Sequence, residues 1–244
     1  MMISNDQLDS YAAVFTVLAR LQLQPADADT RARVMSLLEQ WPLRESLGEG
    51  ANESADYAAG ESSSDAAGKG LTERGIALLK ESAAKAESDS AVWQDQNALY
   101  GIAASAKVSP FESVHLGEDH LVFDEQTLDV RRAYAQVGLQ APRLGREPDD
   151  HIGLEMDFLA RCCLEVLDAL EVPDTRRAEA IMASAEQFTR EHLAQWAPQM
   201  LTSAMEEANS AWVKGMQMLS LGALEKWAAD IGVPWALPMS DDDE

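Results

Sequence analysis

Apolar residues recur at every third or fourth position along most of this chain, and this spacing limits the folds open to it. Near the start, Leu8, Tyr11, Phe15 and Leu18 follow the spacing that puts apolar side chains on one face of a helix. The run HLVF at 120–123 is a short mixed run that suits a strand, and one such run cannot form a sheet. The pattern predicts an all-α fold, a single-domain bundle of about eight to ten helices.

Capping residues and prolines divide this pattern into helices. A helix is expected to follow Ser88, and Gly138 is expected to end another. Pro148 predicts the start of a long helix that ends before Pro173, because proline fits the first turn of a helix and not its interior. Pro198 is expected to interrupt the following helix. We expect the final helix to contain Met205, Ala208, Trp212, Met216 and Gly222, with a bend at the glycine.

Two segments differ in composition from the helical pattern. Residues 45–70 are rich in glycine, serine and acidic residues, and they read as a flexible acidic connection. Residues 241–244 form an acidic tail. No repeat of fixed period is evident, so we expect residues 1–244 to form one helical domain.

The charge of the chain is strongly unbalanced, with 42 acidic and 19 basic side chains and a formal net charge of −23. Such a surface repels nucleic acid and anionic lipid, whereas it attracts a basic peptide, although charge of this kind also simply maintains solubility. No apolar run is long enough to span a membrane, and no export signal precedes the first helix. We therefore expect a cytoplasmic protein that neither binds nucleic acid nor inserts stably into a membrane.

The segment 147–155 contains the densest cluster of chemically capable side chains. Asp149 and Asp150 are expected at the positive end of a helix dipole, and His151 and Glu155 are four residues apart on one helix face. Carboxylates at an exposed helix start can bind guanidinium groups or the N–H groups of a peptide. Ordinary helix capping with one surface pair is the alternative interpretation.

Catalytic and metal-binding patterns are weak in this sequence. His151 and Glu155 could supply two ligands of a metal-dependent hydrolase, with His192 or His115 as a third, but the HExxH spacing is absent. His192 falls on an apolar face, where a hydrogen-bonded core histidine is expected. Cys162 and Cys163 lie in an apolar helix, where thiols are usually inert. We therefore expect a non-enzymatic protein without a metal or another cofactor.

Several blocks in order resemble the TorD/DmsD family of redox-enzyme maturation chaperones, which is related to NarJ. They are the runs LY at 99–100, SPFESVHL at 109–116, TLDVRRAY at 127–134, EPDDHIGLEMDFL at 147–159 and FTREHLAQW at 188–196. The second and fourth of these runs carry most of the resemblance. His115 departs from the tyrosine usual in the family, Tyr100 replaces the usual phenylalanine, and the 45–70 connection is unusually long.

The resemblance implies a TorD-like helical domain that binds the twin-arginine signal peptide, or the apo-form, of a molybdopterin-containing oxidoreductase. Such a chaperone holds its client for cofactor insertion before export. We expect the irregular loop from Pro110 to His120 to face the helix start at 148–151. The predicted peptide-binding residues are Tyr100, Pro110, Phe111, Glu112, Ser113, Pro148, Asp149, Asp150, His151 and Glu155.

Two other functions remain open at this stage, a metal-dependent hydrolase and a permanent accessory subunit of a redox complex. The oligomeric state expected is a monomer or a homodimer, since helical bundles of this kind can exchange helices between copies.

Overall fold

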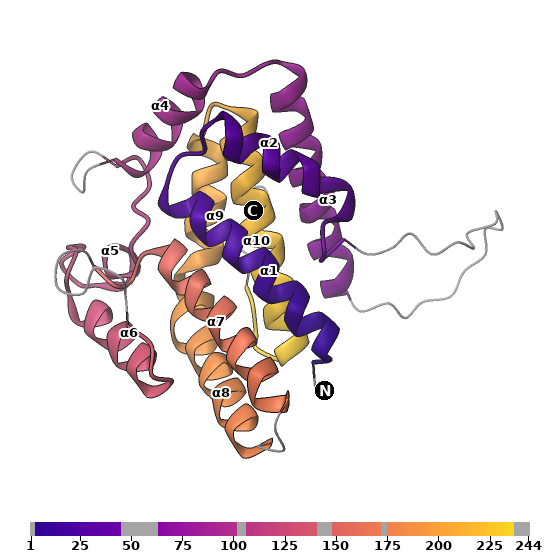
Figure 1. Ribbon diagram of the computed structural model, residues 1–244. Coiled ribbons are helices and arrows are strands. Elements are labelled where there is room, and N and C mark those ends of the chain that lie inside the picture. The colour runs from indigo at the N-terminus through magenta and orange to yellow at the C-terminus, as the bar shows by residue number, and fades with distance from the viewer. Residues whose placement is uncertain (1–2, 45–62, 102–105, 141–147, 172–174, 237–244) are drawn as a thin grey trace.

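A computed structural model describes residues 3–44, 63–101, 106–140, 148–171 and 175–236 of the chain. These residues are mainly helical (Figure 1), and in these ranges extended pairing is limited to one isolated bridge, so the all-α prediction is confirmed. The helices are α1 (Asn5–Leu23), α2 (Ala28–Leu37), η1 (Leu38–Gln40), α3 (Ser63–Ala84), α4 (Asp89–Tyr100), α5 (Glu112–Leu116), α6 (Glu125–Gln136), α7 (Ile152–Glu171), α8 (Thr175–Phe188), η3 (Thr189–Leu193), α9 (Ala194–Glu207) and α10 (Ala211–Ile231).

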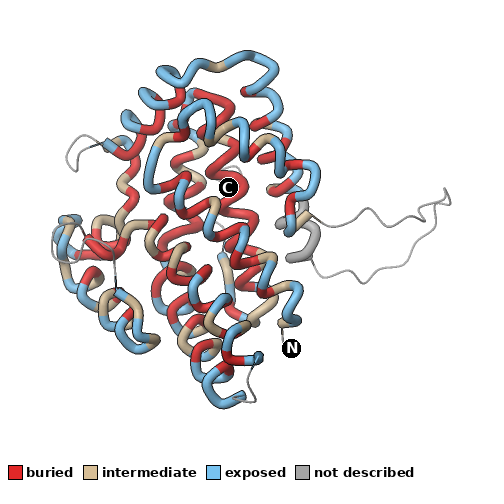
Figure 2. The backbone as a smooth tube through the Cα atoms, viewed as in Figure 1, coloured by how far each residue is buried: buried red, intermediate tan, exposed pale blue. Residues whose placement is uncertain are grey.

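Helix α10 lies at the centre of the bundle and is buried along most of its length (Figure 2). Its most extensive contact is with α3, and the second most extensive contact between helices is that of α1 with α7. The α3–α10 contact is close because both helices carry glycine there. A Cβ atom on Gly215 would lie 2.9 Å from the carbonyl oxygen of Gly75, nearer than such atoms normally approach. Small residues therefore set the distance between these two helices.

A buried polar network joins α1, α4 and α10 within the core. The Gln22 Nε2 group donates to Gln217 Oε1 at 2.9 Å, and Gln217 Nε2 donates to the Tyr100 hydroxyl at 2.7 Å. The Tyr100 hydroxyl in turn donates to Gln22 Oε1. Because each of these polar groups has a partner, the three helices can bury amides among the apolar side chains of the core.

The start of α7 differs from the prediction. The helix begins at Ile152 rather than at Pro148, and the residues before it have bend or bridge geometry. Gly153 lies against α1, and a Cβ atom added to it would lie 2.8 Å from the carbonyl oxygen of Ala19. The close α1–α7 contact therefore requires a small residue in the first turn of α7.

The expected interruption at Pro198 and the expected continuity from Met205 to Trp212 are both wrong. Helix α9 continues through Pro198, which follows the π turn η3, where the helical hydrogen bonds are already shifted. The chain instead breaks at 208–210, where Asp95 of α4 accepts hydrogen bonds from the backbone N–H groups of Asn209 and Ser210 at 3.0 and 2.7 Å. Helix α10 then runs through Gly222 without interruption.

Residues 63–70 belong to helix α3, so this part of the predicted flexible connection is wrong. Residues 45–62 and the 241–244 tail lie outside the described residues. The buried apolar side chains of the described residues form one cluster that draws on α1 to α4 and α6 to α10. The extent of a single domain over 1–244 stays a prediction.

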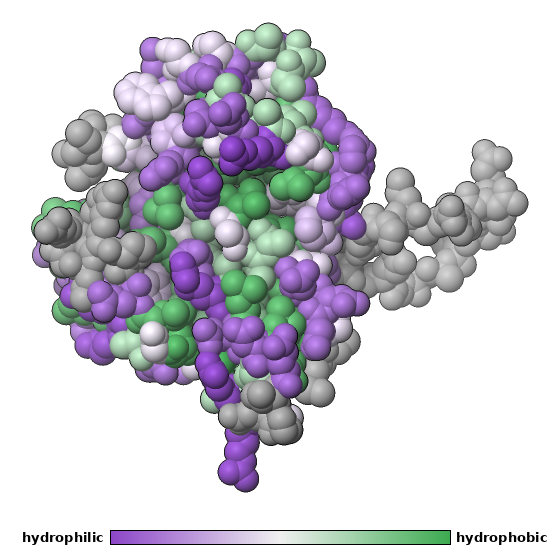
Figure 3. All heavy atoms as spheres, viewed as in Figure 1, coloured by the Kyte–Doolittle hydropathy of each residue, from purple (hydrophilic) through white to green (hydrophobic). Residues whose placement is uncertain are grey.

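The surface in Figure 3 is hydrophilic over much of the visible face, with hydrophobic residues gathered near its middle, over α1 and α7. Within the described ranges, every helix is too short or too polar to cross a membrane. The short helix α5 and helix α6 lie to one side of the α7–α8 pair (Figure 1). Helix α5 lies within the segment 110–120 that was expected to be an irregular loop opposite residues 148–151, so part of this segment is helical.

Candidate functional site

The segments 109–116 and 147–159 meet in a short antiparallel bridge between Phe111 and His151. The Glu112 N–H donates to the Asp150 carbonyl oxygen, and the Ile152 N–H donates to the Pro110 carbonyl oxygen, both at 2.9 Å. The expected contact between the loop and the segment 148–151 is therefore confirmed. We call this paired region, residues 110–113 with 149–152, the junction.

Asp150 holds the junction to α5 and α6 through its side chain. Its Oδ2 atom accepts from the Ser113 N–H at 2.8 Å, and its Oδ1 atom accepts from the Thr127 hydroxyl at 2.8 Å. The side chain is fully buried. The Ser113 N–H lies in the first turn of α5 and has no partner within that helix, so the Asp150 carboxylate satisfies it. The same carboxylate also fixes the first turn of α6.

Asp149 is buried as well and pairs with α6. Its Oδ2 atom accepts from Arg131 Nε at 2.5 Å, and its carbonyl oxygen accepts from the Tyr134 hydroxyl at 3.1 Å. The prediction of an exposed acidic helix start is therefore wrong. Both aspartates face inward because the segment before α7 is an extended strand-like piece pressed against α5 and α6 rather than the first turn of a helix.

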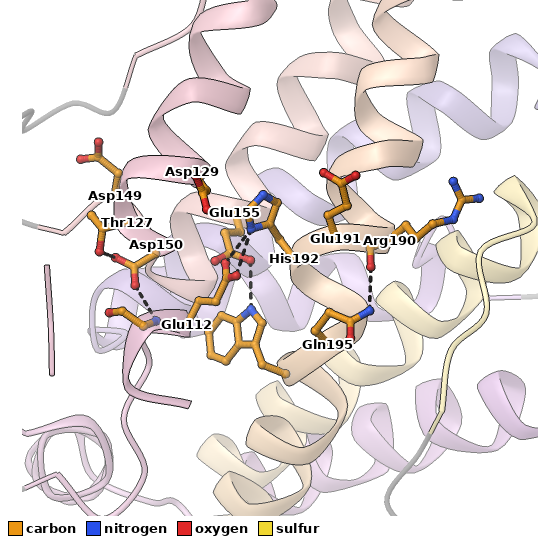
Figure 4. Close-up of polar contacts among 12 residues, drawn as sticks. Glu112, Thr127, Asp129, Asp149, Asp150, Glu155, Arg190, Glu191, His192 and Gln195 are labelled. Carbon is orange, nitrogen blue, oxygen red and sulfur yellow. Dashed lines mark hydrogen bonds and ion pairs between the residues drawn. The ribbon is translucent and has the colours of Figure 1, made fainter. Parts of the chain in front are cut away.

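A second group of buried ionisable side chains lies behind the junction (Figure 4). Both carboxylate oxygens of Glu112 lie 3.0 Å from His192 Nδ1 on η3. Glu155 of α7 accepts from Trp196 Nε1 at 3.3 Å and is hydrogen-bonded to Glu112. Burial, followed by the nearby charges of Glu112 and Asp150, raises the pKa of Glu155 well above its usual value. The protonated form of Glu155 therefore persists to higher pH than that of a carboxyl in water.

His151 lies at the outer end of the junction, where its ring is half-buried. The ring meets Phe111 edge-on with centroids 5.2 Å apart, and it meets Tyr100 at 6.2 Å. Its Nδ1 atom accepts from the Gly153 N–H at 3.0 Å. Burial lowers the pKa of His151 to about 4, so the ring is neutral at neutral pH.

The proposed ligand pair of a metal site is not formed by this arrangement. His151 bonds to the backbone at the start of α7, whereas the Glu155 carboxyl points to Glu112 and Trp196. Over the part of the chain that the structure describes, no group of three or more His, Cys, Asp or Glu side chains is placed to hold a metal ion. The hydrolase interpretation loses the geometry on which it depended.

The two cysteines are buried on α7, as their apolar surroundings suggested. Burial raises the pKa of the Cys162 thiol to about 12, so the thiolate that would act as a nucleophile is scarce at neutral pH.

The structure brings most of the predicted peptide-binding residues together, although few of them reach the surface. Phe111 and His151 are half-buried, and the others are buried: Tyr100, Pro110, Glu112, Ser113, Pro148, Asp149, Asp150 and Glu155. Tyr100 uses its hydroxyl within the core network, and its ring faces His151. The peptide-binding role of this set stays a prediction, with Phe111 and His151 as its accessible members.

A groove of about 490 Å³ lies next to the junction, between α6 on one side and α8 with η3 on the other. Helix α5 closes one end. Sequence reasoning missed this groove because polar residues at helical spacing look the same on a groove wall and on a solvent-facing surface. Its lining residues are Glu112, Leu116, Gln126, Asp129, Arg132, Ala133, Gln136, Ser184, Gln187, Phe188, Glu191 and His192.

The fold and the junction define an all-α protein of TorD-like architecture. The chain belongs to the family described as nitrate reductase delta subunit, whose model matches residues 65–202, more than half of its length. The match covers the junction and both walls of the groove.

Curated relatives extend this likeness. The chain is 28% identical over 89 residues to the chaperone protein TorD of Photobacterium profundum, which is 36% of this chain and 40% of that protein. It is 27% identical over 128 residues to the Tat proofreading chaperone DmsD of Salmonella typhi, which is 52% of this chain and 56% of that protein. The chain thus spans about half the length of these relatives or less, and the resemblance found in the sequence is confirmed.

Proposed function

We propose that this protein is a redox-enzyme maturation chaperone that binds the twin-arginine signal peptide, or the apo-form, of a molybdopterin-containing oxidoreductase. It acts in the cytoplasm, without catalysis, and holds its client until the cofactor is inserted. The names of the relatives support the chaperone class, since they are described as the chaperone TorD and the Tat proofreading chaperone DmsD.

The observation that carries this proposal is the junction itself. The two segments with the strongest family resemblance are separated along the chain, yet they pair at Phe111 and His151. These two rings are half-buried. Glu112, the residue after Phe111, lines a groove of a size that suits a peptide side chain or a small ligand. Leu116, which is exposed on α5, also lines this groove. Aromatic and aliphatic side chains of this kind contact the apolar residues of a signal peptide.

Calorimetry with the signal peptide of a co-encoded molybdoenzyme tests the proposal. We expect the wild type to bind at low salt and Phe111→Ala to bind several-fold more weakly, since the half-buried ring at the junction is lost. Trp93→Ala is the control, because Trp93 is an exposed aromatic on α4 that lies outside both the junction and the groove. Wild-type protein that shows no binding at low salt would refute the chaperone proposal.

A permanent accessory subunit is the second candidate, and the description of the family as a delta subunit favours it. Purification of the mature oxidoreductase separates the two. A chaperone is expected to leave the enzyme once the cofactor is in place, whereas an accessory subunit is expected to co-purify with it in fixed ratio.

A further inference from the structure

The acidic residues of the junction are not free to bind a client arginine. The two side-chain oxygens of Asp150 accept from Ser113 and Thr127, and Asp149 accepts from Arg131. Both aspartates are buried. An incoming guanidinium would have to break these bonds and enter a closed interior. If the client has paired arginines, other carboxylates must receive them.

Two accessible carboxylates face the groove beside the junction. Asp129 lies on α6, on one wall, and Glu191 lies on η3, on the other. Figure 4 shows them on either side of His192, which lines the groove between them. The Asp129 side chain is 41% exposed, and Glu191 is exposed. Both can therefore meet a ligand from solvent without unfolding any part of the protein.

The present partners of these two carboxylates can be exchanged. Glu191 accepts from the neutral amide of Gln187 at 3.1 Å. Asp129 pairs with Arg132 on the same helix, and the Arg132 side chain is 66% exposed. An exposed ion pair of this kind adds little to stability because water screens it. Arg132 also lines the groove, so its guanidinium and that of an incoming arginine would compete for Asp129.

The rest of the groove suits the stem of an arginine side chain. The exposed Leu116 supplies apolar surface, the buried Phe188 lies beneath the groove, and the short side chains of Ala133 and Ser184 leave room between the helices. A volume of about 490 Å³ exceeds the space of one side chain. Arginine binds carboxylates through a planar fork of donors, and its aliphatic stem packs on apolar surface.

We propose that this groove is the arginine subsite of the client peptide, with Asp129 and Glu191 binding the guanidinium groups from opposite walls. Arg132 competes for Asp129 and weakens binding when no client is present. This inference rests on the proposed chaperone function. It places the arginines in the groove and the apolar part of the peptide over Phe111 and His151, at the adjoining end of the junction.

A charge-neutralised variant provides the main test. Calorimetry at about 0.15 M salt, where charges beyond roughly 8 Å are screened, uses a peptide with two adjacent arginines followed by an apolar run. Asp129→Asn with Glu191→Gln is expected to bind at least about tenfold more weakly, since two charge-assisted hydrogen bonds are lost. The matched control is Asp168→Asn with Glu179→Gln, which removes the same charges from exposed positions on α7 and α8 outside the groove.

Removal of Arg132 tests the inference in the opposite direction. Arg132→Ala frees Asp129 and is expected to bind the same peptide several-fold more tightly. Arg161→Ala is its control, because the exposed Arg161 forms an ion pair with the partly buried Asp157 on α7 outside the groove. Binding by Arg132→Ala that is no tighter than binding by Arg161→Ala would contradict the competing role of Arg132.

A second peptide, with both arginines replaced by glutamine, separates the possible outcomes. The wild type and the groove double variant should bind it equally. If the wild type binds neither peptide, the chaperone proposal and this inference both fail. If the wild type binds the arginine peptide and the groove variant binds it as tightly as the control variant does, the chaperone function stands and the arginine subsite is wrong.

Discussion

Glu155 shows how one residue can make this site sensitive to pH. It is fully buried, and it faces Glu112 from α5, Asp150 from the junction and Trp196 from α9. Folding takes this carboxyl out of water and places it near two other acids, which raises its pKa. The folded protein therefore binds this proton more tightly than the unfolded chain does.

The resulting stability is present in full below the unfolded pKa of Glu155, near 4.5, and is lost as pH rises through the higher folded pKa. Glu155→Gln cannot ionise, and its amide has nearly the same shape as the carboxyl. We expect this variant to keep its stability as pH rises. The difference between its free energy of unfolding and that of the wild type should therefore grow with pH. Urea unfolding at a series of pH values measures this. Glu179→Gln, at an exposed position, is the control, and its free energy of unfolding should change with pH as that of the wild type does. The same pH dependence in Glu155→Gln would show that the Glu155 carboxyl does not cause the loss of stability.

Asp150 is a structural residue in this geometry, and its replacement is expected to cost stability. Asp150→Ala leaves the buried N–H of Ser113 and the Thr127 hydroxyl without their acceptors. An unsatisfied buried group costs about 1–3 kcal/mol. Urea unfolding should therefore show a clear loss for Asp150→Ala and almost none for the accessible Asp129→Asn. Wild-type stability in Asp150→Ala would show that the junction does not need this carboxylate.

Helix packing depends on glycine where α3 and α10 meet. An added Cβ on Gly215 would lie 2.9 Å from the Gly75 carbonyl oxygen and 3.0 Å from Leu79. Overpacking of this kind costs about 1–3 kcal/mol, so Gly215→Ala should lower the free energy of unfolding. Gly70→Ala on α3 meets no atom within 4 Å, and helix propensity favours it by up to about 1 kcal/mol. The midpoint of thermal unfolding should fall for Gly215→Ala and rise for Gly70→Ala. A stabilised Gly215→Ala would refute the close packing.

The helices that could be predicted are those whose ends carry their own signals. Ser88 caps α4 by accepting from the Ala91 N–H at 3.1 Å, and Gly138 adopts a φ of +75° after α6. The break at 208–210 could not be predicted in this way, because the acceptor for its N–H groups is Asp95, on another helix. Local sequence indicates local caps, whereas a cap supplied from elsewhere in the fold leaves no signal at the break.

The junction could be predicted from the sequence, whereas the groove could not. Its two segments carry motifs that resemble a known family, and these motifs indicated which residues meet. Burial of Asp149, Asp150 and Glu112 was missed because their charge favours the surface until internal partners are known. Asp129 and Glu191 gave no signal at all, since acidic residues on a helix usually face water.

At the scale of the whole molecule, the net charge of −23 should act mainly on how fast a basic peptide arrives. Stopped-flow measurements of the proposed client binding are expected to show an association rate that falls steeply with salt and a dissociation rate that changes far less. A peptide with glutamine in place of arginine provides the control and should show little salt dependence. An association rate that is insensitive to salt for the arginine peptide would mean that the charge serves solubility alone.

The junction also makes distant parts of the chain open together. The N–H groups of Glu112 and Ser113 are bonded to residue 150, and the N–H of Ile152 is bonded to residue 110. None of these three amides can meet solvent deuterium until the two segments separate. In hydrogen exchange they should therefore behave as one cooperative unit, with a shared opening free energy below that of global unfolding. A peptide bound over Phe111 and His151 would slow all three together, which makes these amides a reporter of occupancy that requires no chemical label.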